Sequence, residues 1–422
     1  MHQLADVADR LKLGCLELDA KFCLEGNDNI DLIEGVPFLH ILGVGGHRDY
    51  KVWQFQYVTN NLRDFSDDVI LLHPDVSKGY MTRRTRPQTP DLYADPFRER
   101  SSKSLRLQLQ LLGARVQFES TSPRLLQLVR HAYAGLPRHR LRATLPKLTV
   151  KLMLRPSGQL RPRTRTEPAA LDMFSGAGWL GAATQASDFV VLCPSQRTAL
   201  VVVSPQTLLF PYHTRYELIE FAVFTLAART QKLASLHAAC VGLDGRGVLL
   251  MGPSGSGKST VTMMSLLSGL EFLSEDSVFV APQTLRATGI ANFLHVRSDS
   301  LRWLEPRARA AVRRSPVIQR RSGVRKYELD LRPGSYRLAR SALQISALVF
   351  LSARGAKAGP LLKVLPRTAV LSRLTAAQAY AAHQPGWESF SKNMSRLPAY
   401  ELRRGGHPIE SVEALRSLLA AI

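Results

Sequence analysis

One eight-residue segment constrains this chain more than any other. Residues 252–259 read Gly-Pro-Ser-Gly-Ser-Gly-Lys-Ser and match the pattern GxxxxGK[ST] in full. The apolar run GVLLM precedes the segment and TVTMMSLLSGL follows it, so a strand, a loop and a helix are predicted in that order. This arrangement directs the backbone N–H groups of the loop and of the helix N-terminus toward bound phosphate.

The side chains of the loop predict how a nucleotide would be held. Contacts to the nucleotide are expected from Gly252, Pro253, Ser254, Gly255, Ser256, Gly257, Lys258, Ser259 and Thr260. The lysine supplies a positive charge for the phosphates, and the Ser259 hydroxyl is a ligand for Mg²⁺. GTPases, transporters and kinases share such a loop, so residues elsewhere must decide the reaction.

Two adjacent acids follow the predicted loop helix. The chain resumes there as LEFLSEDSVFVAP, in which Glu275 and Asp276 interrupt an otherwise apolar run. Carboxylates at the end of a strand near the loop can hold Mg²⁺ and accept a proton from an attacking hydroxyl. We therefore expect both acids to be catalytic and Asp276 to contact the metal as well. The alternative is an acidic pair on a solvated turn.

A histidine lies upstream of the loop. His237 belongs to SLHAACVGLDGRGVLLM, where two apolar strands flank the turn 242–247 and form a hairpin that leads into the loop. A lone histidine in an apolar run is usually a core residue, and spacing alone favours that interpretation.

The order of these features resembles one family, HPr kinase/phosphorylase, and more closely the HPr-kinase-like enzymes found beside peptide-modification systems. That family has a histidine, a hairpin, a GxSGxGKS loop and an acidic pair. This chain has His237, the hairpin, the loop with Ser254 at the family's serine position, and then Glu275 and Asp276. The intervals between them agree with the family pattern, and the resemblance covers residues 233–422.

The resemblance implies roles for these residues. In the family, the first acid of the pair activates the substrate hydroxyl, and the histidine lies beside the phosphates. This chain has Glu275 where HPr kinase has aspartate, so the role of base falls to Glu275 or to Asp276. The family's ExRGxGI signature, associated with phosphorolysis, is missing from the sequence. Arg297 stands about where related kinases present a basic residue to the site, and a surface arginine fits that position equally well.

The predicted fold class is α/β: a P-loop kinase domain resembling HPr kinase and phosphoenolpyruvate carboxykinase, preceded by a smaller α/β region. We predict an N-terminal region of unknown role at 1–103 that ends in a polar linker. A small α/β domain at 104–230 and the catalytic domain at 231–422 follow. The run 158–178 is rich in Arg, Thr, Pro and Gly and is predicted to be an irregular excursion.

The charge of the chain bears on its partners. Lys and Arg number 56 against 34 Asp and Glu, and the net charge of +22 attracts polyanions. Residues 121–165 contain Arg and Lys but no acid, and 302–326 is rich in Arg and Lys with Glu305 as its only acid. The second run is predicted to be a mobile loop that recruits an acidic substrate or closes over phosphates. A solvated loop is the alternative.

Other features narrow the location and the metal chemistry. No apolar run is long enough to cross a bilayer, and the N-terminus lacks a basic region followed by an apolar core, so we expect a cytoplasmic protein without membrane contact. The cysteines show no CxxC spacing, which argues against a zinc site. Whether the chain forms a homo-oligomer stays open.

The favoured hypothesis is a kinase that uses ATP and Mg²⁺ to phosphorylate a Ser or Thr hydroxyl of a protein or peptide. A small-molecule kinase is the closest variant. A non-catalytic, nucleotide-dependent protein that binds a polyanion such as nucleic acid is a second class, which the absence of known nucleic-acid-binding motifs disfavours. An ABC-type ATPase is set aside because the LSGGQ signature is missing.

Overall fold

The computed structural model describes residues 40–43, 53–56, 104–155, 170–184, 188–356 and 359–422. The chain divides into two compact units, Met1–Asp91 and Leu92–Ile422. In the first unit, strands β1 (His40–Gly43) and β2 (Trp53–Gln56) pair antiparallel. The linker predicted ahead of residue 104 lies outside the described residues.

The first part of the larger unit, residues 104–231, is called the first lobe. Its seven-stranded sheet has the order β3-β4-β5-β9-β8-β7-β6, and helices α3 and α5 pack on it. The strands are β3 (Leu105–Leu111), β4 (Ala114–Ser120), β5 (Lys147–Leu154), β6 (Leu171–Gly176), β7 (Trp179–Thr184), β8 (Phe189–Cys193) and β9 (Thr198–Val203). The alternating apolar residues of β4 and β5 are buried under the helices.

Helix α3 spans Pro123–Tyr133, and the helical run after η2 (Thr207–Leu209) consists of α4 (Pro211–His213), η3 (Thr214–Ile219) and α5 (Glu220–Gln231). The π-helical turn η3 thus interrupts the helical run between α4 and α5. Such turns are frequent at functional sites. The predicted irregular excursion at 158–178 is wrong in its second half, because β6 pairs with β7 there, and its residues 158–169 lie outside the described residues.

The second lobe, residues 234–422, is built on a nine-stranded mixed sheet. The strands of this sheet are β10 (Ala234–Leu236), β11 (Ala239–Leu243), β12 (Arg246–Met251), β13 (Glu271–Ser274), β14 (Val278–Val280), β15 (Arg286–Gly289), β19 (Leu343–Gly355), β20 (Leu362–Val364) and β21 (Ala399–Arg404). Parallel pairing of β12 with β19, and of β19 with β21, forms its buried centre. The chain is therefore a mixed α/β protein with several sheets.

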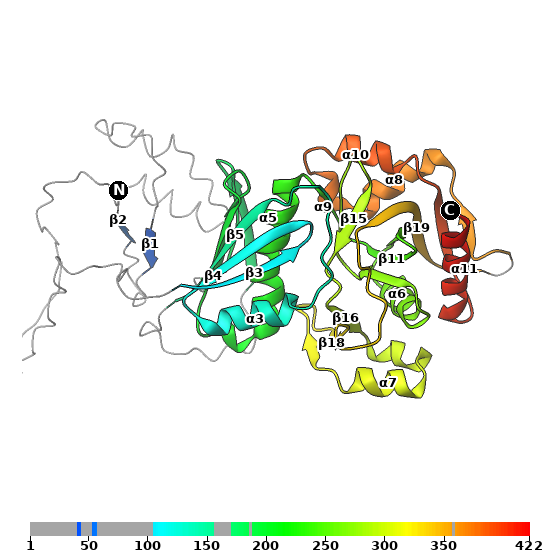
Figure 1. The fold of residues 1–422 in the computed structure, drawn as a ribbon, viewed down its shortest axis with the longest axis horizontal. Coiled ribbons are helices and arrows are strands. Elements are labelled where there is room, and N and C mark those ends of the chain that lie inside the picture. The colour runs from blue at the N-terminus through cyan, green and yellow to red at the C-terminus, as the bar shows by residue number, and fades with distance from the viewer. Residues whose placement is uncertain (1–39, 44–52, 57–103, 156–169, 185–187, 357–358) are drawn as a thin grey trace, which may run out of the picture. The chain divides into compact units, whose positions relative to one another are not determined.

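The helices of the second lobe are α6 (Lys258–Leu267), η4 (Ser298–Trp303), α7 (Pro306–Arg313), α8 (Arg367–Ala377), α9 (Ala379–Ala382), α10 (Trp387–Met394) and α11 (Pro408–Ala421). Helices α6 and α11 pack against each other beside β11 (Figure 1). A separate three-stranded sheet contains β16 (Phe293–Val296), β18 (Arg325–Asp330) and β17 (Val317–Gln319).

The predicted hairpin is confirmed, because β11 pairs antiparallel with β12. Its turn residues Asp244 and Gly245 have φ values of 50° and 81°, which suit a two-residue hairpin loop. By contrast, the mobile loop predicted at 302–326 is wrong. That run forms the end of η4, helix α7 and strand β17, because its few apolar side chains, among them Leu304, Val312 and Ile318, are buried.

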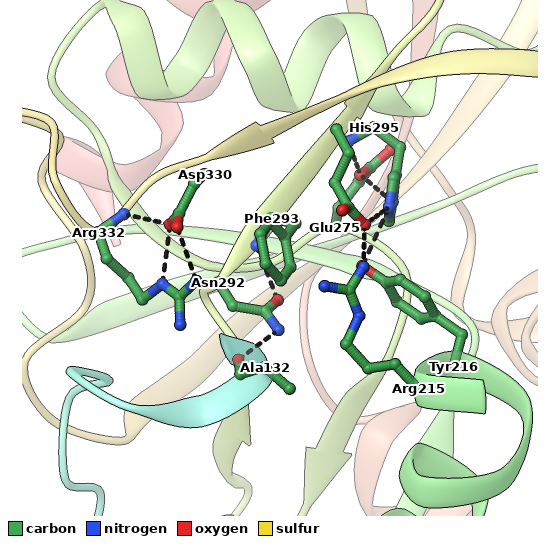
Figure 2. Close-up of polar contacts among 10 residues, drawn as sticks. Ala132, Arg215, Tyr216, Glu275, Asn292, Phe293, His295, Asp330 and Arg332 are labelled. Atoms are coloured by element: carbon green, nitrogen blue, oxygen red, sulfur yellow. Dashed lines mark hydrogen bonds and ion pairs between the residues drawn. The ribbon is translucent and has the colours of Figure 1, made fainter. Parts of the chain in front are cut away.

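Buried polar contacts join the two lobes. His139 of the first lobe is 2.8 Å from both the Thr288 hydroxyl and the Ala339 carbonyl oxygen. The Asn292 side-chain amide donates to the Ala132 carbonyl at 2.9 Å (Figure 2). The predicted domain boundary after residue 230 lies at the end of α5, yet Leu92–Ile422 forms one compact unit.

Candidate functional site

A cleft of about 590 Å³ opens at the N-terminus of α6. Most of the residues predicted to form the site line it: Pro253 through Thr260, His237, Asp276 and Arg297. Glu275 and Gly252 do not line the cleft. Segments far apart in the sequence complete its walls, including residues 403–406 at the end of β21 and just beyond it.

The glycine-rich loop, residues 252–257, connects β12 to α6. Gly255 and Gly257 have φ values of 80° and 98°, a region in which any other residue would be strained, and Gly257 caps α6. A Cβ atom on Gly252 would lie 2.8 Å from Ser256 Oγ. Ser256 Oγ is itself buried and has no partner among the described residues. The loop therefore fits the backbone cradle that a phosphate group needs.

Lys258, His237 and Asp276 line the cleft and contact one another. Lys258 Nζ donates to His237 Nε2 at 2.9 Å, and His237 Nδ1 lies 3.1 Å from Asp276 Oδ1. An ammonium group can only donate, so Nε2 accepts and the proton on Nδ1 faces the carboxylate. Burial lowers the pKa of His237 and of Lys258, while the Asp276 charge opposes both shifts. His237 is thus a neutral side chain that contacts the Lys258 ammonium group through Nε2 and the Asp276 carboxylate through Nδ1.

The position of His237 is fixed through its backbone. The buried amide of Gln378 accepts from the His237 backbone N–H at 2.7 Å and donates to its carbonyl oxygen at 3.1 Å. Sixty-two per cent of the His237 side chain is exposed, so the core position favoured from spacing alone is wrong. The sequence carries no signal for Gln378, which lies far along the chain beyond α8.

Glu275 does not line the cleft, and its buried side chain belongs to a network with His295 (Figure 2). Its Oε2 accepts from the His295 backbone N–H at 2.9 Å and lies 3.6 Å from His295 Nδ1. It also accepts from the Ser259 side chain. The two acids of the pair therefore have different environments: Asp276 borders the cleft, and Glu275 holds Ser259 and His295.

The network continues from His295 into the first lobe. His295 Nε2 lies 3.0 Å from the Tyr216 hydroxyl and 3.4 Å from Glu328 Oε1, and Arg215 forms an ion pair with Glu328. His295 and Glu328 are opposite each other in the β16–β18 pair, which brings their side chains together. Arg215 also lies 4.5 Å over the Phe293 ring. Sequence reasoning missed this network because its members are far apart in the chain.

Burial and hydrogen bonding oppose each other in this network. Burial alone raises the pKa of Glu275, but hydrogen bonds from His295 and Ser259 lower it to about 2. Burial likewise raises the pKa of Glu328, and His295 together with Arg215 lowers it to about 2. Burial lowers the pKa of His295, but the carboxylates of Glu275 and Glu328 outweigh burial and raise this pKa above its usual value. The two carboxylates thus favour the protonated form of His295.

The Arg215–Glu328 pair is expected to stabilise the junction of the lobes. Replacing Arg215 with Met leaves a buried carboxylate with fewer partners, so we expect the free energy of unfolding to fall by about 3 kcal/mol. Arg337 is the matched control, because its pairs with Asp244 and Glu271 are exposed and its replacement by Met should cost less than about 1 kcal/mol. Urea unfolding measures both.

Adding Glu328→Gln to the Arg215→Met variant removes the stranded charge and should recover part of the lost stability. Equal, small losses in the Arg215→Met and Arg337→Met variants would contradict the assigned importance of the buried pair.

The cleft is strongly basic around Asp276. Arg320 Nη2 lies 3.7 Å from Asp276 Oδ2, while Arg320 Nε is buried without a partner among the described residues. Lys326 also lines the cleft, and burial lowers its pKa. Arg297 lines the cleft too, but its side chain is 55% exposed and pairs with Asp299 at 3.3 Å. This excess of cations suits a polyphosphate.

A second cavity of about 360 Å³ adjoins the cleft. It shares Asp276, His295, Arg320 and Ser322 with the cleft, and residues of α4, η3 and α5 from the first lobe supply its far wall. Asp276 is therefore a carboxylate that borders both cavities.

The predicted Mg²⁺ site would have only two protein ligands, Ser259 and Asp276. In the described part of the chain, no group of three or more His, Cys, Asp and Glu side chains is arranged to hold a metal ion. Ser259 and Asp276 both line the cleft, and such a pair fits Mg²⁺ only where phosphate oxygens and water complete its shell. No described helix combines the length and hydropathy needed to cross a membrane.

Comparison with known proteins finds a weak structural likeness to a solved structure. Neither a protein-family model nor a curated protein matches the chain. Among solved structures, the HPr(Ser) kinase/phosphatase from Coxiella burnetii matches with 13% identity and a TM-score of 0.24 over 44% of this chain and 99% of that one. A likeness at this level identifies no family, so the resemblance inferred from sequence stays a prediction.

Proposed function

We propose that this chain is a kinase that transfers the γ-phosphoryl group of ATP to a hydroxyl, with Ser or Thr of a protein or peptide as the favoured acceptor. The observation that carries the proposal is the place of Asp276. It lies 3.9 Å from Lys258 in the cleft with the glycine-rich loop, and it also borders a second cavity with room for an acceptor. A carboxylate between the two reactants is what phosphoryl transfer to a hydroxyl needs.

The residues of the site suit distinct tasks. The glycine-rich loop, the N-terminus of α6 and Lys258 bind the phosphates, and the guanidinium group of Arg320, which lines the cleft, is a further donor for phosphate oxygen. Ser259 and Asp276 would hold Mg²⁺, which would supply positive charge to neutralise the phosphates. Glu275 holds the Ser259 hydroxyl in place and is occupied by hydrogen bonds, so we assign the base to Asp276.

In the proposed step, Asp276 removes the proton of the acceptor hydroxyl. The hydroxyl oxygen forms a bond to the γ-phosphorus while the bond from that phosphorus to the β,γ-bridging oxygen breaks. ADP leaves with the electron pair of that bond. His237 keeps Asp276 in position and holds Lys258 toward the phosphates, since it contacts both.

A small-molecule kinase is a second candidate because the cavity beside Asp276 has the size of a small-molecule site. The non-catalytic, nucleotide-dependent binding protein is less well supported, because such a protein does not require a carboxylate that borders two cavities.

The proposal is tested by incubating the full chain with Mg²⁺ and γ-labelled ATP in the presence of two acceptor panels. One panel contains Ser and Thr peptides, and the other contains hydroxylated metabolites. We expect label in at least one acceptor and none when Mg²⁺ is removed with EDTA. Tight binding of ATP without labelling of any acceptor in either panel would favour the non-catalytic, nucleotide-dependent binding protein.

A further inference from the structure

The second cavity has a chemical character of its own. Its far wall consists of Tyr212, Tyr216, Glu217 and Glu220 from the helical run that contains η3. The tyrosine rings have centroids 4.6 Å apart and form an aromatic surface beside the carboxylates. An aromatic surface next to carboxylates is suited to a cation.

Most charged groups around this cavity already have partners. Glu217 pairs with Arg321 and accepts from His213 at 2.9 Å. Arg320 pairs with Asp276, and His295 lies between Glu275 and Glu328. An anionic ligand would have to displace one of these carboxylates.

Glu220 is the exception. Its half-buried side chain lines the cavity and forms neither a hydrogen bond nor an ion pair with any residue that the structure describes. Desolvation raises the pKa of Glu220 to about 8, although His295 and Arg215 oppose the shift, and the Asp276 charge adds to it. A protonated amine beside this carboxyl would favour its ionised form and gain a charge-assisted hydrogen bond.

We propose that the second cavity is the acceptor subsite and that it selects an acceptor with a protonated amine close to the hydroxyl. The amine binds Glu220 against Tyr212 and Tyr216, and this contact places the hydroxyl at Asp276. The inference rests on the proposed kinase function and narrows its substrate class. Two sources offer this chemistry: a peptide whose free amino terminus is Ser or Thr, and a free hydroxyamino acid.

The test compares acceptors that differ in the amine alone. Wild-type protein is assayed for kcat/KM with a peptide that begins with serine, with the N-acetylated form of that peptide, with L-serine and with glycerate, which has a hydroxyl in place of the amine. We expect a preference of about 10- to 100-fold for the amine within one of the two pairs, the usual range for one charge-assisted hydrogen bond. The pair that shows it identifies the source.

Glu220→Gln should remove this preference while ATP affinity stays unchanged, and Glu305→Gln, an exposed acid outside the cavity, should keep it. Equal use of amine and amine-free acceptors by the wild type overturns the inference and leaves the kinase proposal intact. A preference that persists in Glu220→Gln also overturns it. If none of these four acceptors is phosphorylated but some other hydroxyl compound is, the amine-selective subsite is excluded and the kinase proposal is not. Transfer to no hydroxyl at all excludes both.

Discussion

Replacing Lys258 with Ala is expected to lower the rate of ATP turnover by roughly 10²- to 10³-fold, the range seen when one donor to a developing charge is removed. ATP affinity should fall by at least about tenfold, because a charge-assisted hydrogen bond to phosphate is lost. Lys258 faces the cleft and contacts His237 and Asp276 there, so the variant should still fold. Calorimetric titration with ATP and a coupled ADP assay measure the two effects.

Lys392 is the matched control for this prediction. It is an exposed lysine on α10, outside the residues that line the cleft, and Lys392→Ala should leave both quantities unchanged. Unaltered ATP affinity and turnover in Lys258→Ala would remove the glycine-rich loop from the proposed site.

The acidic pair provides the second large effect. Asp276→Asn should slow phosphoryl transfer by roughly 10²- to 10⁴-fold, the range for loss of a general base. ATP should still bind, with weaker affinity for its Mg²⁺-bound form because Asp276 would hold the metal. Glu275→Gln should act differently. Its hydrogen bonds to Ser259 and His295 weaken, so stability and affinity for Mg²⁺-bound ATP should fall more than the rate of the chemical step.

This comparison separates the roles of the two acids. Transfer rates are measured at saturating ATP and Mg²⁺, and stability is measured by urea unfolding. A slow chemical step in Glu275→Gln combined with full activity in Asp276→Asn would reverse the assignment. It would also restore the role that the family resemblance implies for the first acid.

Local sequence patterns predicted the elements around the site well. The hairpin, the strand ahead of the glycine-rich loop and helix α6 were predicted because each depends on neighbouring residues: alternating apolar side chains, a turn that tolerates positive φ, and glycines at the helix start. The acidic pair was placed at a strand end for the same reason. The different directions in which Glu275 and Asp276 point could not be predicted. They depend on His295 and His237, which belong to other parts of the chain.

The errors have physical causes as well. The charge of residues 302–326 suggested a mobile loop, but a few buried apolar side chains such as Val312 are enough to fix a short helix. The network of Arg215, Glu328 and His295 joins the two lobes over long sequence separations. No periodic pattern marks such contacts, so only the folded chain reveals that the first lobe reaches the acidic pair and forms a wall of the second cavity.

The most direct measurement is the fate of the γ-phosphate, followed by ³¹P NMR with full-length wild-type protein, Mg²⁺, ATP and the two acceptor panels. We predict that ATP is converted to ADP and a phosphomonoester in equal amounts, and that Asp276→Asn binds ATP but forms the ester at least about a hundredfold more slowly. Conversion of ATP to ADP and free inorganic phosphate alone, or ATP that remains intact with every acceptor, would contradict a kinase centred on Asp276.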